Sequence, residues 1–300
     1  MSDLDALVTG GTVQRDVDLS SMTTYKVGGS ARWFAQPSDV ATLETVAGAW
    51  RSSGEPPLFV LGRGSNVVVS DRGFPGLVVK LGTGFGAIDM DGDLVRAGGA
   101  VSLPVLARAA VASGRRGLEW YVGIPGTVGG AVHQNAGCHG SETIDVLMDS
   151  LVVSFATATV EIRPVEDLGL RYRHSDLGPS DIVARATFHT SPGDPAAGEG
   201  IMREVTRWRK ANQPGGTLNA GSVFKNPPDD AAGRLVEKAG LKGLSVGGAR
   251  VSERHANFIE ADRRATASDI RALVREVRRR VRDVSGVDLE PEIAFVGPFD

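Results

Sequence analysis

The chain has a single cysteine, Cys138, among its 300 residues. One thiol cannot form an intrachain disulfide or a cysteine-based zinc cluster, so no metal site is expected and a reducing cytoplasm fits this composition. A charge excess of one sign is also lacking, because 33 basic and 36 acidic side chains leave a net charge of -3. This balance gives no overall attraction to nucleic acid or to an anionic membrane, so neither is expected as a partner.

Long apolar runs are absent as well. No stretch approaches the about 20 consecutive apolar residues that a bilayer-spanning helix needs. Residues 1–20 carry acids where a secretory signal would carry bases, so the chain is expected to be cytoplasmic. The hydrophobic content of 41% is enough for a sizeable core, and a chain of 300 residues is typical of two domains.

Glycine, in contrast, is abundant and clustered, with 39 residues. One cluster, LGRGSN at 61–66, follows an expected strand at 57–61 and precedes another at 67–69. Such a loop can offer backbone N–H groups and short polar side chains to an anion. It has neither the Gly-Lys-Ser/Thr of a Walker loop nor the spacing of a Rossmann fingerprint, so an ordinary tight turn stays open as an alternative.

Short β-rich runs at 77–81, 94–97, 151–155 and 181–188 alternate with helical patterns at 38–53 and 102–114. This alternation predicts an α+β fold. The stretch 191–198 is rich in proline, glycine and alanine and is expected to be a linker or loop.

Three helices are expected after this stretch, the first ending near Trp208, the second at about 230–239 and the third at about 266–284. In the third, Thr266 and Asp269 have the spacing of a capping box. Its apolar face would consist of Ile270, Leu273, Val274, Val277 and Val281. The arginines of this helix are interpreted as a solvated face, because no aromatic residues interleave with them.

Ser222 lies in LNAGSVFKNPP at 218–228. A nucleophilic serine usually sits in a G-x-S-x-G elbow, and here Phe224 occupies the second glycine position. From this stretch alone, a turn serine that bonds its own backbone is the simpler interpretation. A cysteine nucleophile is another alternative, because His133, Asn135 and His139 surround Cys138 in the sequence.

Seven separated blocks, in this order, resemble the UDP-N-acetylenolpyruvoylglucosamine reductase family over residues 20–297. They are TTYKVGG (23–29), LGRGSN (61–66), GIPGTVGGAVHQNAG (123–137), YRHS (172–175), NAGSVFKNP (219–227), GLKG (240–243) and LEPE (289–292). The chain continues from YRHS without an inserted tyrosine-bearing loop, so it resembles the shorter class of the family.

The resemblance implies a flavoenzyme of bacterial peptidoglycan (cell wall) synthesis. Its fold would be α+β, with a two-subdomain FAD-binding domain of the vanillyl-alcohol oxidase (PCMH) type at 20–195 and an α+β substrate-binding domain at 200–297. FAD would be bound noncovalently, and glycine loops would let the backbone approach it closely. The implied FAD contacts are Gly62, Arg63, Gly64, Ser65, Asn66, Gly123, Pro125, Gly126, Thr127, Gly129, Gly130, Asn135 and Gly137.

The implied reaction is the reduction of an enolpyruvyl ether, which places negative charge next to a carboxylate and requires a proton. A guanidinium is a forked donor for a carboxylate, which suits Arg173. Ser222 would donate the proton, and Glu292 would polarise the developing charge. Glu290 is the nearest competitor for the role of Glu292.

The resemblance also implies the substrates. They are a UDP-sugar enolpyruvyl ether and NADPH, which use one cleft in turn, and a monomer is expected. The implied substrate contacts are Tyr172, Lys210, Lys225 and Asn226, with Arg209 as an alternative to Lys210. Two other functions stay open at this point: an oxidase or dehydrogenase of a small alcohol on the same FAD domain, and a binding protein that has lost catalysis.

Overall fold

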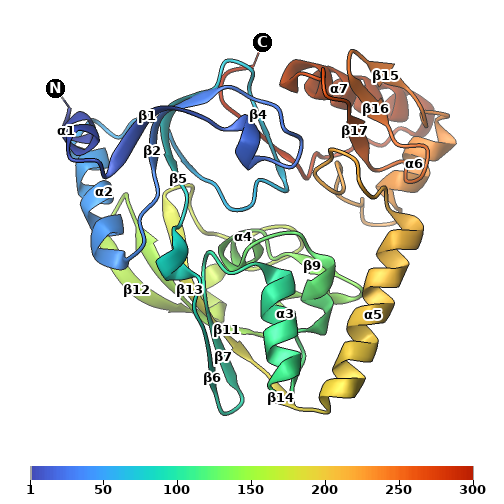
Figure 1. Cartoon of the computed structure of the whole chain (residues 1–300). Coiled ribbons are helices and arrows are strands. Elements are labelled where there is room, and N and C mark those ends of the chain that lie inside the picture. Colours follow the sequence, from blue (N-terminus) through green and yellow to red (C-terminus); the bar gives the residue numbers. More distant parts are fainter. Residues whose placement is uncertain (1, 300) are drawn as a thin grey trace. The chain divides into compact units, whose positions relative to one another are not determined.

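The structure is a computed structural model that describes residues 2–299, and it is α+β as predicted (Figure 1). The chain forms two compact units, each built from three segments. The first unit comprises Met1–Arg15, Trp33–Gly62 and Gly76–Arg209. The second unit comprises Asp16–Arg32, Arg63–Pro75 and Lys210–Asp300. The functional boundaries at 20–195 and 200–297 stay a prediction.

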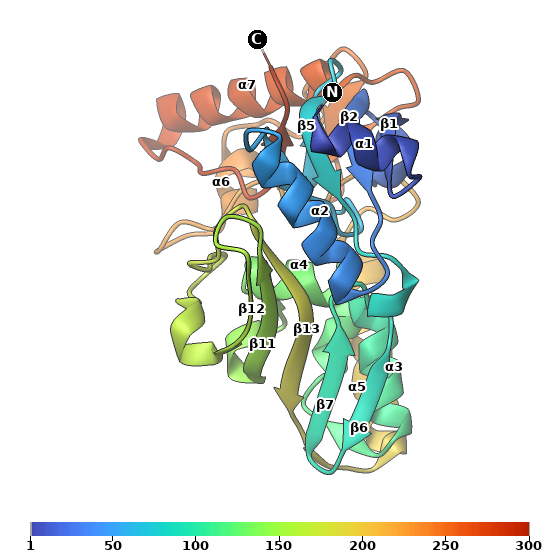
Figure 2. The ribbon, with the colours of Figure 1, turned by 90° about the vertical axis from the view of Figure 1, so that its left-hand side faces the viewer.

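A five-stranded antiparallel sheet organises the first unit, in the order β12-β11-β13-β7-β6 (Figure 2). Successive side chains of a strand point to opposite faces of the sheet. A sheet that is covered on both faces therefore buries neighbouring side chains of one strand in two different cores. Accordingly, Ile182 of β13 packs in one apolar core with α2, and Val183 packs in another with α3 and α4. The elements are α2 Val40–Ser52, β6 Ile88–Asp91, β7 Leu94–Gly98, α3 Leu103–Ala112, α4 Val128–His133, β11 Leu147–Ser154, β12 Thr159–Pro164 and β13 Asp181–His189.

A second sheet has the strand order β1-β2-β5-β3. It consists of β1 Val13–Asp18, β2 Ser30–Ala35, β5 Phe74–Val79 and β3 Leu58–Val60, and helix α1 spans Asp3–Thr9. The shorter strands are β8 Arg115–Arg116, β9 Gly137–Cys138, β10 Ser141–Glu142 and β14 Ser191–Pro192. The 3-10 turns are η1 Ser20–Met22, η2 Thr83–Phe85, η3 Glu119–Gly123, η4 Thr143–Asp145 and η5 Val165–Leu168.

The expectation of a linker at 191–198 is wrong. Strand β14 pairs with β8, and helix α5 then begins at Pro195 and runs to Asn212. Proline is tolerated in the first turn, and the carboxylate of Asp194 accepts hydrogen bonds from two N–H groups of that turn. Gly198 is buried in α5 against α3. A Cβ there would lie 2.8 Å from Val111 Cγ1, so the glycine permits this close helix packing rather than providing flexibility.

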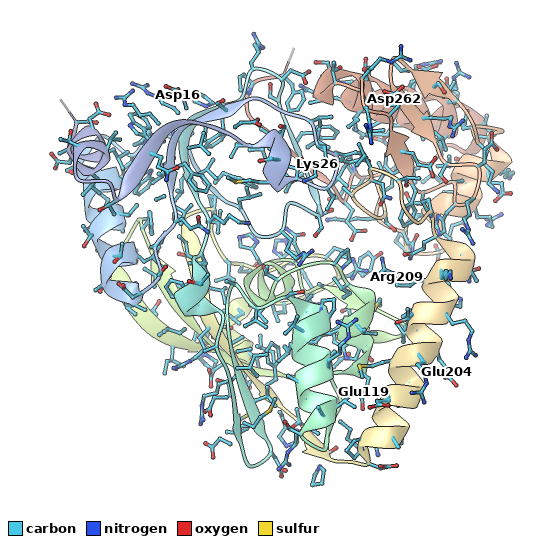
Figure 3. The ribbon with its side chains drawn as sticks, in the orientation of Figure 1. Asp16, Lys26, Glu119, Glu204, Arg209 and Asp262 are labelled. Atoms are coloured by element: carbon cyan, nitrogen blue, oxygen red, sulfur yellow. The ribbon has the colours of Figure 1, made fainter. Side chains whose placement is uncertain are left out.

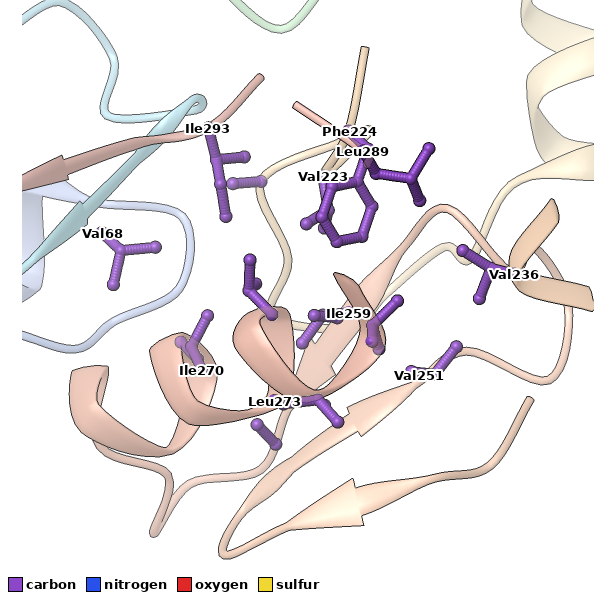
Figure 4. Close-up of a cluster of buried hydrophobic side chains, with 14 of the residues drawn as sticks. Val68, Val223, Phe224, Val236, Val251, Ile259, Ile270, Leu273, Leu289 and Ile293 are labelled. Carbon is purple, nitrogen blue, oxygen red and sulfur yellow. The ribbon is translucent and has the colours of Figure 1, made fainter. Parts of the chain in front are cut away.

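One apolar core fills the second unit (Figure 4). The predicted capping box of Thr266 and Asp269 begins α7, and the five predicted apolar residues of this helix are buried. Ile270 and Leu273 of α7 pack in this cluster with Val251 and Ile259 (Figure 4). The elements are β4 Val67–Val69, α6 Ala232–Lys238, β15 Ser245–Val246, β16 Ala249–Val251, β17 Ile259–Ala261, α7 Ala267–Ser285 and β18 Ala294–Val296. Across residues 2–299, no helix combines the length and the apolarity needed to span a membrane.

A remote carboxylate caps α7. Asp71 accepts hydrogen bonds from the N–H groups of Ala267 and Ser268 and from the Ser268 hydroxyl, at 2.7–2.9 Å. Because it satisfies two N–H groups at the positive end of the helix, Asp71→Ala should lower the free energy of unfolding by about 1–2 kcal/mol, measured by urea denaturation. The matched control is Asp283→Ala, since Asp283 makes only an exposed ion pair with Arg279 on the same helix. Equal losses in both variants would contradict the capping role.

Candidate active site

Gly62 of the loop at 61–66 lies against Thr127 of the loop at 123–137, and both residues belong to the first unit. A Cβ on Gly62 would lie 2.9 Å from Thr127 Oγ1, so the absence of a side chain permits this approach. Lys80, which the sequence did not indicate, donates from Nζ to the Gly62 carbonyl at 2.6 Å. Thr127 in turn caps α4 by accepting from the N–H of Gly130.

Gly64 has a different reason to be glycine. Its φ is +65°, and a Cβ there would collide with the Met22 carbonyl and lie 2.7 Å from Thr23 Cα. The Gly64 carbonyl also accepts from Thr24 N at 3.0 Å. A substitution at Gly64 would therefore strain the protein itself, so its effect on FAD binding would be hard to separate from its effect on folding.

Two glycines of the loop at 123–137 could carry a Cβ without a clash inside the protein. A Cβ on Gly126 would find its nearest neighbour at 3.5 Å, and so would a Cβ on Gly130, which is exposed on α4. Neither has a positive φ. Glycine inside a helix is less favourable than alanine by roughly 0.5–1 kcal/mol, so Gly130 fits a position where a bound group must approach the backbone. The residues present therefore fit the FAD that is expected here.

The other glycines of this loop are explained by packing inside the protein. A Cβ on Gly123 would lie 3.1 Å from Cys138 Sγ, one on Gly129 would lie 3.1 Å from a Val183 carbonyl, and one on Gly137 would lie 2.7 Å from a Ser141 carbonyl. Of the remaining predicted FAD contacts, Arg63 and Pro125 are exposed, Ser65 is half-buried, Asn66 donates to the Glu292 carbonyl at 3.0 Å, and Asn135 is fully buried.

Gly130→Val tests the cofactor loop more cleanly than a change at Gly64. A Cβ at this position would make only an ordinary contact with Thr127 Oγ1, at 3.5 Å, so the variant should fold but lose most of its FAD. Flavin content after gel filtration and the melting temperature of the apoprotein are the measurements. Gly48→Val is the matched control, because Gly48 lies in α2 with nothing within 4 Å of a Cβ, and this variant should retain FAD. Stoichiometric FAD in Gly130→Val would contradict the proposed cradle.

The Ser222 loop lies beside the segment just before β18 that carries the two candidate glutamates, within the second unit. Lys225 N donates to the Glu290 carbonyl at 2.9 Å, and Glu292 N donates to the Val223 carbonyl at 2.8 Å. Phe224 and Pro291 form the bridge between these two bonds. Ser222 and Glu292 therefore lie at one end of a short antiparallel ladder.

Asn257, which no local pattern indicated, holds the other side of this loop. Its side-chain oxygen accepts from Phe224 N at 3.0 Å, its amide donates to Phe224 O at 2.9 Å, and its backbone carbonyl accepts from Val223 N at 2.8 Å. The side chain that closes the turn is Asn219, which accepts from Gly221 N at 3.1 Å. The backbone around Ser222 is thus fixed without the Ser222 hydroxyl.

The structure distinguishes the two glutamates. Glu290 is exposed and forms an ion pair with Lys225 at 2.7 Å, whereas Glu292 is half-buried. Asn226, a predicted substrate contact, accepts from Ala232 N at 3.0 Å at the start of α6. Lys225 and Asn226 therefore both have structural partners within the second unit.

Arg173 lies in a tight turn of the first unit. Arg171 and His174 exchange two backbone hydrogen bonds around it, and Arg173 has a φ of +52°, which is unusual for a side chain other than glycine. Its Nη2 donates to the Gly137 carbonyl at 2.9 Å. Its guanidinium lies 4.9 Å from the ring of Tyr172, which is exposed.

Cys138 lacks the properties of a nucleophile. Burial raises the pKa of its thiol to about 11, so the thiolate is scarce at neutral pH. Its Sγ donates to the Trp120 carbonyl at 3.3 Å, and the ring of His139 packs edge-on against Trp208. The cysteine interpretation is therefore wrong.

The two cations near the end of α5 differ in environment. Arg209 projects from α5 near its end (Figure 3). It is half-buried, and burial lowers the pKa of its guanidinium. Lys210 is exposed, and its backbone carbonyl accepts from Arg254 at 2.6 Å. Of the three predicted catalytic residues, Ser222 and Glu292 belong to the second unit and Arg173 to the first.

Two family models match most of the chain. Residues 31–162 match the model of an FAD binding domain, and residues 213–296 match that of the C-terminal domain of UDP-N-acetylenolpyruvoylglucosamine reductase. The reductase of Novosphingobium aromaticivorans is 42% identical over 289 residues, which cover 96% of both chains. That of Synechococcus sp. (strain WH7803) is 40% identical over 98% of this chain and 96% of its own.

The fold agrees as well. The crystal structure of the reductase from Thermus caldophilus superposes with a TM-score of 0.81 at 37% identity, over 94% of this chain and 98% of that one. The resemblance carried by the seven sequence blocks is confirmed, and so is the FAD-binding fold class. The chain therefore belongs to the UDP-N-acetylenolpyruvoylglucosamine reductase family and is an FAD-binding oxidoreductase.

Proposed function

We propose that this chain reduces UDP-N-acetylglucosamine enolpyruvate to UDP-N-acetylmuramate in peptidoglycan precursor synthesis, with NADPH as the co-substrate. Noncovalently bound FAD supplies the hydride for this reaction. The backbone of 62–66 and of 123–137 would hold it, with Gly126 and Gly130 leaving the necessary room. The alternative of a small-alcohol oxidase loses its support, because the family match extends over nearly the whole chain.

Three side chains carry the substrate chemistry in this proposal. Reduction at the terminal carbon places negative charge on the neighbouring carbon and its carboxylate. The forked guanidinium of Arg173 binds that carboxylate and stabilises the charge. The Ser222 hydroxyl donates the proton to the neighbouring carbon, and Glu292 polarises the developing charge through a hydrogen bond.

The observation that carries this proposal is the antiparallel bridge between the Ser222 loop and the segment of Glu292. The hydrogen bond from Glu292 N to Val223 O links the backbones of the proton donor and the carboxylate. Asn257 fixes the opposite side of the same loop, so the donor is held before substrate binds. Preorganisation of this kind removes the entropic cost of assembling catalytic groups at the moment of reaction.

The remaining assignments complete the proposal. Tyr172, Lys210, Lys225 and Asn226 contact the UDP-sugar substrate, with Arg209 as the alternative to Lys210. The enzyme works in the cytoplasm as a monomer, and neither nucleic acid nor a membrane is a partner.

One spectroscopic experiment tests the function. The purified protein should show the absorbance of oxidised flavin, NADPH should bleach it, and the enolpyruvyl sugar nucleotide should restore it without oxygen. If only oxygen or a small carbonyl compound restores the absorbance, the proposed substrate is wrong. If bound flavin is bleached but nothing restores it, the chain has lost the second half of the reaction.

A further inference from the structure

We propose that Glu142 is a positioning residue that holds the guanidinium of Arg173 in the orientation required by the substrate carboxylate. The inference deepens the proposed function and rests on the role assigned there to Arg173. Glu142 ends strand β10, five residues after the second glycine loop, and both residues belong to the first unit.

The two carboxylate oxygens of Glu142 have different partners. Oε1 lies 3.5 Å from Arg173 Nη1, and Oε2 accepts from Asn135 Nδ2 at 2.9 Å. The Glu142 side chain is 31% exposed and that of Arg173 is 17% exposed, so water screens this ion pair less than a surface pair. As the N-cap of η4, the Glu142 side chain also accepts from the Asp145 N–H. These bonds anchor the carboxylate while Oε1 faces the cation.

Asn135 orients that carboxylate. Its side chain is fully buried, its Oδ1 accepts from Ile144 N at 2.9 Å, and its amide also donates to the Arg171 carbonyl at 3.2 Å. These hydrogen bonds of Asn135 thus join Glu142 to the turn that contains Arg173. This network gives the buried amide of Asn135, an FAD contact implied by the family resemblance, partners within the protein. It also fixes the orientation of the Glu142 carboxylate.

The turn fixes the backbone of Arg173 but does not fix the rotamer of its long side chain, so further contacts are required to orient the guanidinium. A long arginine side chain loses up to about 2 kcal/mol of rotamer freedom when it is ordered. The Gly137 carbonyl fixes Nη2, and Glu142 approaches Nη1 on the same guanidinium. One hydrogen bond on Nη2 and one ion contact at Nη1 act on two nitrogens of a planar group, so together they favour one plane as well as one position.

The length of the ion pair is compatible with substrate binding. Charge-assisted N–H···O bonds are typically about 2.7–2.9 Å long, whereas the distance from Oε1 to Nη1 is 3.5 Å. A longer contact orients the cation while leaving it able to form a shorter bond with an incoming carboxylate. Glu142 would then act on catalysis only through Arg173.

Glu142→Gln tests the inference directly. Glutamine keeps the shape of the side chain and can still accept a hydrogen bond from Asn135. Its NH₂ group would then face the guanidinium, and because both groups are hydrogen-bond donors, the orienting contact is lost. Reoxidation of the reduced enzyme by substrate should slow ~10- to 100-fold, while reduction by NADPH, FAD content and melting temperature stay unchanged. Asp93→Asn is the matched control, because Asp93 is a carboxylate of the same unit that pairs with Arg115 at 2.6 Å, and it should leave both half-reactions unchanged.

A double-mutant cycle separates positioning from general damage to the loop. In an Arg173→Ala background, Glu142→Gln should slow reoxidation by less than about 2-fold further, because the residue through which it acts is absent. Added guanidinium chloride at low concentration should partly restore Arg173→Ala, and this rescue should weaken when Glu142 is also changed. Equal losses from Glu142→Gln in both backgrounds would overturn the positioning role.

The same variants separate this inference from the proposed function. A normal reoxidation rate in Arg173→Ala would remove the catalytic role of Arg173, and the role of Glu142 with it. A slow Arg173→Ala together with a normal Glu142→Gln would leave the proposed function intact and overturn the inference alone.

Discussion

Replacing Ser222 with alanine is expected to slow reoxidation of the reduced enzyme by substrate ~10²- to 10⁴-fold, the usual contribution of one positioned proton donor. Reduction by NADPH should remain near normal, because this half-reaction requires no proton at the substrate carbon. Stopped-flow absorbance of the flavin follows both half-reactions separately.

The structure makes this substitution a clean test. The Ser222 loop is held by the backbone and side chain of Asn257 and by the N–H of Glu292, so alanine removes one hydroxyl without releasing the loop. Ser245→Ala is the matched control, because Ser245 is an exposed serine of the same unit whose hydroxyl bonds only a nearby carbonyl. An unchanged reoxidation rate in Ser222→Ala would sink the assignment and return Ser222 to the role of a turn residue.

Glu292→Gln is expected to cripple reduction of the enolpyruvyl substrate, again by ~10²-fold or more, and to leave FAD binding and oxidation of NADPH largely intact. Glutamine keeps the shape and the hydrogen-bonding capacity of the residue but cannot transfer a proton or carry the charge, so the variant tests chemistry rather than packing.

Glu290→Gln is the built-in comparison and should be mild. The Glu290 side chain is 68% exposed and its partner is Lys225 at 2.7 Å. An exposed pair of this kind contributes only about 0–1 kcal/mol to stability. A larger defect in Glu290→Gln than in Glu292→Gln, measured in the same stopped-flow assay, would place the catalytic carboxylate two residues earlier.

The local elements of the fold could be predicted from the sequence because their determinants lie within a few residues of one another. The capping box of Thr266 and Asp269 and the apolar face of α7 are an example, and both occur as predicted. Alternation and turn residues likewise placed the strands around the first glycine loop. The linker expected at 191–198 was wrong because a proline and a glycine serve equally well in a helix start and in a packed helix interface.

Order along the chain also determined the family, since seven short blocks in a fixed sequence identify it without any knowledge of their positions in space. Order did not indicate which other residues support the site. Asn257 holds the Ser222 loop across 33 residues, and nothing in its own neighbourhood marks it. Glu142 acquires its place only when Asn135 and the Arg173 turn, 36 residues apart, are brought together.

Only the tertiary structure shows the reason for which each position requires glycine. In the sequence Gly64 and Gly130 are equivalent small residues of two loops. In the fold a Cβ on the first would clash with the backbone of Met22 and Thr23, whereas a Cβ on the second would make only an ordinary contact with Thr127. The difference depends on which atoms the rest of the chain places within 4 Å of an absent Cβ, and a pattern along the chain does not contain that information. The sequence therefore determined the chemistry available to this protein, and the packing of distant segments decided which residues are held in place to perform it.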